Sequence, residues 1–371
     1  MNIHHRHTLR SLILATALTL GFASSAFAQQ SALFVDLNSK EVTALGPLGS
    51  EASGINEMGQ VVGSFPTANG NHHAFLTGPN GVGKTDLGTL GGGADFSSAY
   101  GVNNAGQVVG TSEAVNGHNH AFITGPNGVG MTDLGTLGGG TDSLAEGINN
   151  AGQVVGHSST SGSVGHAFIT DPGGGGMRDL GTFGGVFSRA LGINNVGQVV
   201  GYSQTADGRD QAFITGPNGL GMTALDTGAG ASSHAFGIND KGQVVGYFIT
   251  DNFQVHAFIT GPNGAGMTDL GTLGGNSSVA HEINEAGQVV GNFTSNDFLQ
   301  PHAFITGPNG VGMTDLNSVL SLPGDSIILA ADINNHGQLA AVGVIPEPEM
   351  YAMLLLGLGL IGFLARGRAT G

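Results

Sequence analysis

The nine residues Ile148-Asn149-Asn150-Ala151-Gly152-Gln153-Val154-Val155-Gly156 decide the fold, because related stretches recur along the chain. The other copies begin at Ile55, Val102, Ile193, Ile238, Ile283 and, in a worn form, Ile333. Neighbouring copies start 45 to 50 residues apart. Self-similarity at a fixed period of this length is typical of repeat architectures. We therefore expect seven related units between about residues 32 and 343.

Two further elements accompany the first. His-Ala-Phe-Ile/Leu-Thr begins at His73, His120, His166, His256 and His302, with Gln211 in the histidine place of one copy. Thr-Asp-Leu-Gly-Thr-Leu-Gly-Gly begins at Thr85, Thr132 and Thr268, with Arg178 as its first residue in another copy and decayed copies at Thr223 and Thr314. Residues 32–46 supply a degenerate first copy of both, so each element occurs seven times.

Each unit of about 45 residues contains four short apolar runs, which in the third unit are residues 120–124, 131–137, 145–149 and 153–157. Gly125-Pro126-Asn127-Gly128 joins the first two runs, since proline presets the second turn position and asparagine and glycine tolerate a positive φ. Asn149-Asn150-Ala151-Gly152 closes the last two in the same way. Two hairpins per unit predict a four-stranded antiparallel sheet.

Four strands in about 45 residues are typical of a β-propeller blade, and seven blades lie within the usual range. The sequence thus predicts an all-β chain with a single seven-bladed β-propeller over residues 32–343. A β-solenoid is the competing architecture, although its coils are usually much shorter. The worn end copies fit both architectures. The chain contains no Trp, so it is not a WD40 propeller.

Composition agrees with a turn-rich β protein. The 68 Gly and 12 Pro exclude a helical bundle, because glycine inside a helix costs about 1 kcal/mol relative to alanine. We expect the glycines of the repeated elements to end or turn short strands. The formal net charge is −16, which argues against nucleic-acid binding. The absence of Cys excludes disulfides, thiol catalysis and Cys-ligated metal sites.

Both ends of the chain have the features of sorting signals. Residues 1–28 have a basic start, an apolar run and a small-residue cleavage site at Ala26 and Ala28, which predicts a secretory signal peptide; a retained anchor is the alternative. Residues 344–371 contain Pro346, Glu347 and Pro348, an apolar run at 350–365, and Arg366 and Arg368. A helix of 16 residues spans about 24 Å, slightly less than a bilayer core, so it predicts a short membrane span.

The Pro-Glu-Pro motif, the apolar run and the basic end resemble the PEP-CTERM sorting signal of Gram-negative bacteria. The resemblance implies recognition by an exosortase, transient anchoring in the inner membrane, and delivery to the cell surface or the extracellular space. A plain tail anchor is the alternative. The His-Ala-Phe elements resemble the HAF-repeat family of extracellular bacterial proteins, which implies an exported protein and no particular activity.

The repeated polar residues have structural and chemical interpretations. Equivalent histidines on separate blades could meet at one metal ion only around a central axis, so we expect them to bond neighbouring groups. Asp86, Asp133, Asp179, Asp269 and Asp315 could bind calcium, but no run of closely spaced acidic residues accompanies them, and turn fixing is the expected role. No phosphate-binding loop or nucleophile elbow is present. The sequence therefore predicts no catalytic residue, metal or cofactor.

Variation between copies concentrates in the segments that join Val-Val-Gly to His-Ala-Phe. They comprise residues 64–72, 111–119, 157–165, 202–210, 247–255 and 292–301. Equivalent loops of repeats share one face, so these segments predict a common binding rim, with neutral drift as the alternative. The candidate contact residues are Phe65, His118, Tyr202, Tyr247, Phe253 and Phe298.

Together these features predict a non-enzymatic surface or matrix protein, with a binding or structural role toward extracellular polysaccharide or surface proteins. The alternative is a secreted carbohydrate-active hydrolase or lyase on the same scaffold. An enzyme is expected to break the repeat symmetry with a unique acidic pair, and the near-identity of the copies argues against one. Ice or mineral binding requires a flat threonine array, which a ring of blades would not present.

Overall fold

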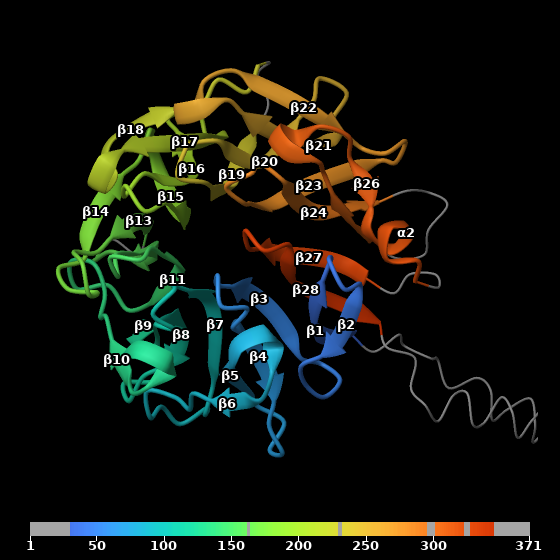
Figure 1. The fold of residues 1–371 in the computed structure, drawn as a ribbon. Coiled ribbons are helices and arrows are strands. Elements are labelled where there is room, and N and C mark those ends of the chain that lie inside the picture. Colours follow the sequence, from blue (N-terminus) through green and yellow to red (C-terminus); the bar gives the residue numbers. More distant parts are fainter. Residues whose placement is uncertain (1–29, 162–163, 229–231, 295–300, 323–326, 345–371) are drawn as a thin grey trace, which may run out of the picture. The chain divides into compact units, whose positions relative to one another are not determined.

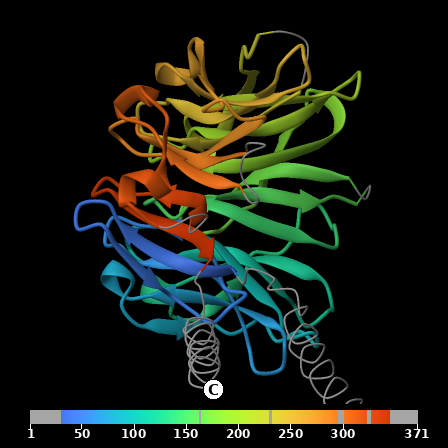
Figure 2. The ribbon, with the colours of Figure 1, turned by 90° about the vertical axis from the view of Figure 1, so that its right-hand side faces the viewer.

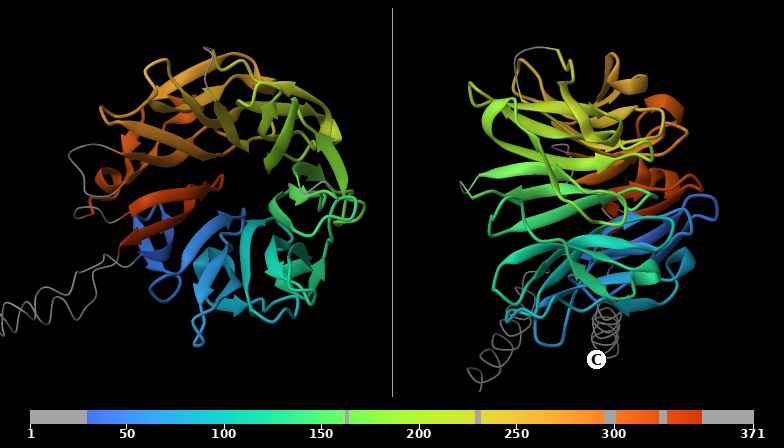
Figure 3. Two further views of the ribbon diagram at one scale, coloured as in Figure 1. Left: turned by 180° about the vertical axis from the view of Figure 1, so that it is seen from behind. Right: turned by 90° about the vertical axis from the view of Figure 1, so that its left-hand side faces the viewer.

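The computed structural model describes residues 30–161, 164–228, 232–294, 301–322 and 327–344. Residues 30 to 344 form one compact unit made almost entirely of short antiparallel sheets. Five sheets have four strands and one has eight, and they follow one another around a common centre (Figures 1 and 3). The eight-stranded sheet consists of two four-stranded halves that a single parallel bridge, Val255 to Ser277, joins.

The strands fall into four classes by their distance from the centre. The innermost strands are β3 (Glu51–Ile55), β7 (Ser97–Val102), β11 (Ser143–Ile148), β15 (Gly184–Ile193), β19 (Ser233–Ile238), β23 (Ser277–Ile283) and β27 (Ile327–Ile333). The second strands are β4 (Val61–Pro66), β8 (Val108–Glu113), β12 (Val154–Ser159), β16 (Val199–Thr205), β20 (Val244–Ile249), β24 (Val289–Thr294) and β28 (Gln338–Val344).

The outer half of each sheet carries the remaining repeated elements. The third strands are β5 (His72–Thr77), β9 (Asn119–Thr124), β13 (Gly165–Ile169), β17 (Asp210–Gly216), β21 (Val255–Thr260), β25 (His302–Ile305) and β1 (Gln30–Asp36). The outermost strands are β6 (Lys84–Asp86), β10 (Met131–Asp133), β14 (Arg178–Gly181), β18 (Leu220–Ala224), β22 (Met267–Gly271), β26 (Thr314–Asp315) and β2 (Glu41–Ala44). One short helix, α2 (Leu316–Leu320), follows β26.

The prediction of strands was right, but the grouping of strands into sheets was wrong. The four runs of the third unit become β9, β10, β11 and β12, and these belong to two different sheets. Each sheet instead runs from an Ile-Asn strand through Val-Val-Gly and His-Ala-Phe to Thr-Asp-Leu. The variable segment between Val-Val-Gly and His-Ala-Phe is a hairpin turn within a sheet. The grouping was wrong because a repeating sequence does not indicate at which residue the structural unit begins.

The ring closes through both ends of the unit. Strand β1 pairs antiparallel with β28 along its whole length, from Gln30 opposite Val344 to Asp36 opposite Gln338. The closing sheet therefore takes two strands from the start of the unit and two from its end, which lie side by side in Figure 1. This closure distinguishes the fold from the open solenoid.

The repeated asparagines build a second closure, at one end of the central channel. In each Ile-Asn element the Asn Nδ2 donates to the backbone oxygen of the equivalent Asn in the next sheet, from Asn56 to Asn103 (2.9 Å) and onward through every sheet. The last bond returns from Asn334 Nδ2 to the oxygen of Asn56 at 3.0 Å. The ring of asparagines thus ties each sheet to both of its neighbours.

Apolar cores lie between neighbouring sheets, which Figure 2 shows stacked side by side. The phenylalanine of each His-Ala-Phe element is fully buried there, for example Phe75, Phe122 and Phe168. Phe168 packs with Val109 and Ile123 of the preceding sheet. Each sheet is therefore stabilised mainly through its neighbours, as expected for repeat proteins.

The turns between third and fourth strands confirm the predicted role of Gly-Pro-Asn-Gly. Each becomes a single 3-10 turn: η1 (Pro79–Gly81), η2 (Pro126–Gly128), η3 (Pro217–Gly219), η4 (Pro262–Gly264) and η5 (Pro308–Gly310). Their asparagines adopt φ of 54° to 56°, a conformation that asparagine tolerates better than most residues.

The glycine of Val-Val-Gly has a different role from the one that its sequence predicts. Gly156 lies in the middle of β12, opposite Ala145 of the inner strand, and ends nothing. A Cβ at this position would overlap the carbonyl oxygen of Leu144. The same overlap with an inner-strand carbonyl arises at Gly63, Gly110, Gly201, Gly246 and Gly291. The glycine is thus repeated because the inner strand approaches its Cα too closely for any side chain.

Several predicted features lie outside the described residues: the signal peptide with Ala26 and Ala28, Phe298, and the tail with its apolar run at 350–365. In the described part of the chain, no helix is both long and apolar enough to cross a membrane.

Candidate functional site

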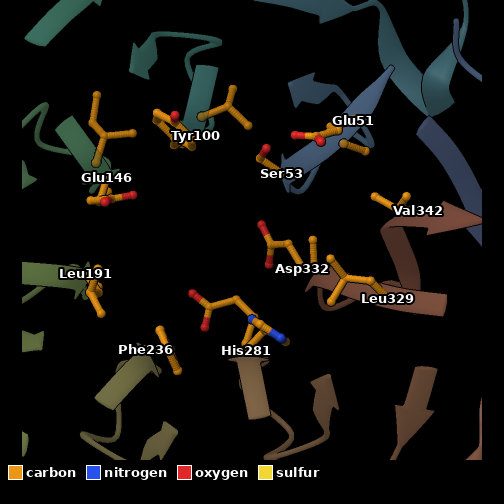
Figure 4. Close-up of a pocket in the computed structure, with 18 of the residues that line it drawn as sticks. Glu51, Ser53, Tyr100, Glu146, Leu191, Phe236, His281, Leu329, Asp332 and Val342 are labelled. Carbon is orange, nitrogen blue, oxygen red and sulfur yellow. The ribbon is translucent and has the colours of Figure 1, made fainter. Parts of the chain in front are cut away.

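The innermost strands enclose a central cavity of about 660 Å³. All seven of them contribute to its wall, and Figure 4 shows their side chains converging on a common space. A cavity of this size lies within the range of small-molecule sites.

A β-bulge aims one side chain of each inner strand into the cavity. In the sheet of β11 and β12 the register shifts between Ala145 and Gly147, which leaves Glu146 between them without a partner in the ladder. The equivalent shift occurs in all the inner strands. The bulged residues are Ser53, Tyr100, Glu146, Leu191, Phe236, His281 and Ala331, and each lines the cavity. Bulges often re-aim side chains in this way.

These seven residues differ in chemistry, although their flanking residues repeat closely. The opposite end of the channel behaves differently, because asparagines of all seven elements form the same ring there. The copies therefore have the same residue where it links neighbouring parts of the ring, and different residues where the side chains face the cavity.

An ion pair crosses two strands of the wall. Arg189 Nε donates to Glu146 Oε1 at 2.8 Å, and its terminal nitrogen contacts the same oxygen. Burial raises the pKa of the Glu146 carboxyl, although Arg189 opposes this effect. Among the described residues that line the cavity, Arg189 is the one permanent cation, and Glu146 already neutralises it.

Aromatic rings cover another part of the wall. The Tyr202 ring stacks on His234 with centroids 3.7 Å apart, and Tyr247 lies 4.9 Å from the same histidine. Phe236 continues the row toward His281, at 5.6 Å. Burial lowers the pKa of both histidines, so they are neutral at neutral pH and add no cation to the cavity.

Two carboxylates break the repeat beside these rings. The residue before the Ile-Asn dipeptide is glycine in five elements, namely Gly54, Gly101, Gly147, Gly192 and Gly237. In the other two it is Glu282 and Asp332, and both line the cavity. The near-identity of the copies thus does not exclude a unique acidic pair, contrary to the interpretation of the sequence. A single substitution per copy was enough to create it.

Within the described part of the chain, backbone amides donate the hydrogen bonds that these two carboxylates accept. Asp332 accepts hydrogen bonds from the amides of Ile55 (2.8 Å) and Ile333 (2.7 Å), and Glu282 accepts one from Ile283 (3.0 Å). Burial raises the pKa of Asp332 to about 7. Burial, followed by the charge of Asp332, raises the pKa of Glu282 well above its ordinary value.

The raised pKa of Asp332 predicts a pH-dependent stability. Between pH 3.8, the ordinary pKa, and about pH 7, the folded state binds more protons than the unfolded state, so the free energy of unfolding falls as the pH rises. Asp332→Asn stays neutral and should remove on the order of 4 kcal/mol of this decline. Urea unfolding at pH 4 and pH 8 measures the effect. Asp251→Asn, on an exposed loop, should leave the decline in place, and an equal decline in both variants would contradict the assignment.

The predicted rim residues do not gather in one place. Tyr202 lines the cavity and Tyr247 packs beside it. Phe65 packs in the core between two sheets, and Lys84 Nζ lies 3.8 Å above its ring. His118 and Phe253 lie on hairpin turns, where Phe253 is 88% exposed. Sequence variation in the loops thus indicated two residues near the cavity and missed the bulged positions.

The repeated histidines pair with the repeated aspartates on the outer strands. In five copies of the repeat the His Nδ1 lies 2.7 to 3.0 Å from the Asp carboxylate, as in His166 and Asp179 at 2.8 Å. Both residues are replaced together in the two remaining copies. Gln211 and Ala224 stand at the equivalent positions in one copy, and Ser31 and Ala44 in the other. Among the described residues, no group of three or more His, Cys, Asp or Glu could hold a metal ion.

This joint loss predicts energetic coupling between the two side chains. Asp179→Ala should destabilise the protein by about 1 to 2 kcal/mol, because its carboxylate also accepts the Gly181 amide at 2.7 Å. The same change in a His166→Gln background should cost about 0.5 to 1 kcal/mol less. A double-mutant cycle by urea unfolding measures the coupling. Strictly additive effects would show that the pairing contributes nothing.

The fold is similar to that of several solved structures. Similar solved structures include the β-propeller domain of the Trilobed protease from Pyrococcus furiosus (TM-score 0.54, 10% identity, 77% of this chain and 87% of that one). Others are a putative TolB from Agrobacterium tumefaciens (0.51, 11%, 86% and 99%) and a puromycin hydrolase (0.53, 12%, 80% and 51%). The fold is a β-propeller. Identities this low show the architecture alone. The comparison with curated proteins finds no match for this propeller.

Residues 344–369 match the family described as the PEP-CTERM protein-sorting motif. The match contains Pro346, Glu347, Pro348, Arg366 and Arg368, the residues that the sequence predicts to form the motif. It indicates export to the cell envelope or surface, since this motif is a sorting signal that an exosortase recognises. The match begins at Val344, the last residue of β28, which is the strand that closes the propeller ring.

Proposed function

We propose that this protein is a non-enzymatic surface or matrix protein that binds extracellular saccharide in its central cavity. One observation carries the proposal: the bulged positions of the seven inner strands diverge, while the residues around them keep the repeat. A purely structural ring has no need of seven different side chains at one equivalent, cavity-facing position. A binding site has that need, because recognition requires an asymmetric arrangement of groups.

The chemistry of the cavity supports a saccharide ligand. The faces of aromatic rings such as Phe236 and Tyr202 suit the apolar faces of sugars. Carboxylates such as Glu282 and Asp332 offer acceptors to hydroxyl groups, and no cofactor is needed for binding. The sorting motif delivers the protein to the compartment in which extracellular polysaccharide is found.

The proposal also includes the number of blades, the repeat family and the route of export. Counting the eight-stranded sheet as two blades gives a seven-bladed propeller, with one blade per repeated element. The His-Ala-Phe repeats then define a HAF-repeat protein that a signal peptide directs into the secretion pathway. A C-terminal helix would anchor it transiently in the inner membrane before an exosortase releases it.

A glycan array with the exported protein tests the binding function. Phe236→Ala removes a cavity ring and should abolish binding, whereas Phe253→Ala removes an exposed ring on a hairpin turn and should not. Loss of binding with Phe253→Ala alone would move the site to the loop rim that the sequence predicts. Absence of binding to every glycan would overturn the proposal.

The sorting route has its own test, by intact-mass spectrometry of the protein recovered from the cell surface. We expect a mature chain that lacks the tail after the Pro346-Glu347-Pro348 motif. A surface protein that still ends at Gly371 would contradict sorting by cleavage. Replacing Pro346 and Pro348 by alanine should retain the full-length chain in the membrane fraction.

A carbohydrate-active enzyme is the second candidate, because Glu282 and Asp332 supply the acidic pair that such an enzyme requires. Raised pKa values would suit one of them as a general acid. Release of reducing ends or unsaturated products from a bound polysaccharide, abolished by Glu282→Gln, would replace the binding function with this one.

A further inference from the structure

The charged side chains of the cavity restrict the class of ligand more than the shape of the cavity does. Four carboxylates line it, those of Glu51, Glu146, Glu282 and Asp332. Arg189 is the single permanent cation among the described lining residues, and it pairs with Glu146. Glu282 and Asp332 therefore face the cavity, where they accept hydrogen bonds from backbone amides and no basic side chain among the described residues pairs with them.

The neighbouring glycines explain how the two carboxylates fit. A Cβ at Gly237 would overlap the Glu282 carboxylate, so Glu282 occupies the space that a side chain on the neighbouring inner strand β19 would fill. Asp332 reaches in the same way across a sheet boundary, to the amide of Ile55 beside Gly54. In Figure 4 the Asp332 side chain projects into the cavity between Ser53 and His281. Both carboxylates are thus held at defined places in the wall.

Such a site favours a cation over a neutral ligand. Burial raises the pKa of both carboxyl groups, and a positive charge nearby opposes this effect, so a bound cation favours their ionised forms. The aromatic rings add to the attraction, since ring faces bind ammonium groups. A bare divalent metal ion fits poorly, because it prefers six or more oxygen ligands and the described residues hold no metal-binding group of three.

We infer that the cavity recognises a saccharide with a free, protonated amino group, and that Glu282 and Asp332 bind the ammonium. This inference rests on the proposed binding function and narrows its ligand to amino sugars that are not acetylated. The Phe236 ring contacts the apolar face of the sugar, and the two carboxylates accept hydrogen bonds from the ammonium.

The test compares two saccharides that differ only at the amine. Isothermal titration calorimetry with the exported protein measures binding of a β-linked glucosamine tetrasaccharide and of its fully N-acetylated counterpart. We expect the glucosamine form to bind at least tenfold more tightly. Raising NaCl from 50 to 500 mM should weaken this binding and leave that of the acetylated form unchanged, because salt screens the charge interaction.

Glu282→Gln and Asp332→Asn should each reduce the preference to less than threefold. Glu282→Gly restores the residue that five other elements carry, so it provides a second variant that the fold accommodates. Glu41→Gln, on the outermost strand β2, is the matched control and should keep the full preference. Thermal unfolding confirms that each variant is folded.

The outcomes separate the inference from the proposed function. Equal affinity for both saccharides, or a preference that survives both carboxylate variants, would overturn the inference while leaving saccharide binding intact. Failure of the glucosamine form to bind would also overturn it. Loss of all glycan binding on the array is the result that overturns the proposed function.

Discussion

Gly156→Ala is expected to destabilise the protein by about 4 kcal/mol or more, which is a large part of the stability of a typical domain. The added methyl group would overlap the carbonyl oxygen of Leu144 and approach the Cα of Ala145 to 2.9 Å. Both groups belong to the backbone of the inner strand, so no side chain can rotate to make room. Relief requires β11 and β12 to separate, which breaks their hydrogen-bond ladder.

Gly93→Ala is the matched control. This glycine has no positive φ, and a Cβ there meets nothing within 4 Å. The change should alter the free energy of unfolding by less than about 0.5 kcal/mol. Urea unfolding followed by circular dichroism compares the two variants. Similar stability of both would show that the inner strand can move away from Gly156.

The closing sheet already contains a natural counterpart of this substitution. Ala341 occupies the place of the Val-Val-Gly glycine there, opposite Ala330. In this sheet the register of the inner strand shifts once more, between Ile327 and Leu329, next to the alanine. Among the other inner strands, β15 also has a second register shift, but it lies between Gly184 and Ser188 rather than next to the glycine. An alanine at this position is thus found together with an altered inner strand.

Asn149→Ala is expected to cost about 3 to 5 kcal/mol, because it removes one member of the asparagine ring. Asn149 is 3% exposed, and its Nδ2 donates to Gln153 Oε1 (2.9 Å) and to the oxygen of Asn194 (3.1 Å). Its Oδ1 accepts from the amides of Ala151 (3.1 Å) and Gln153 (3.0 Å). Alanine satisfies none of these four bonds, and buried donors and acceptors are left unpaired.

The adjacent Asn150 provides the control for this prediction. Its side chain also reaches a neighbouring sheet, since Oδ1 accepts from the amide of Asn104 at 3.0 Å, but this contact is exposed to solvent. Water can replace the lost acceptor, so Asn150→Ala should cost less than about 1 kcal/mol. Thermal and urea unfolding measure both variants. Equal costs would show that the ring contributes no more than an exposed turn contact.

Much of the architecture could be predicted from the repeat. The four strand positions of each unit, the positive φ of the Gly-Pro-Asn-Gly asparagines and the sorting motif follow from local patterns. The grouping of strands did not follow, because β9 and β10 share a sheet with β7 and β8 rather than with β11 and β12. Turn chemistry specifies which strands are consecutive, whereas the sheet boundary depends on packing between neighbours.

The candidate site was largely missed, although the sequence carried its signal. Glu282 and Asp332 stand where five other elements have glycine, and the bulged residues from Ser53 to Ala331 vary within an otherwise constant element. Comparison of loops drew attention to Phe65 and His118 instead, which lie in a core and on a turn. The position of the bulge must be known before the orientation of the side chains at residues 146 and 281 can be predicted. One extra residue reverses the alternation of side chains between the two faces of a strand.

The sequence by itself determined that the chain is an exported, all-β repeat protein, because period, turn residues and sorting motif are local properties. Only the tertiary structure decided that the ring closes through β1 and β28, that the Val-Val-Gly glycine accommodates a carbonyl, and that one residue per inner strand faces the cavity. These three features depend on the approach of strands from different parts of the chain. Their physical cause is the packing of backbone segments that are distant in the sequence, and a local pattern of side chains does not predict that packing.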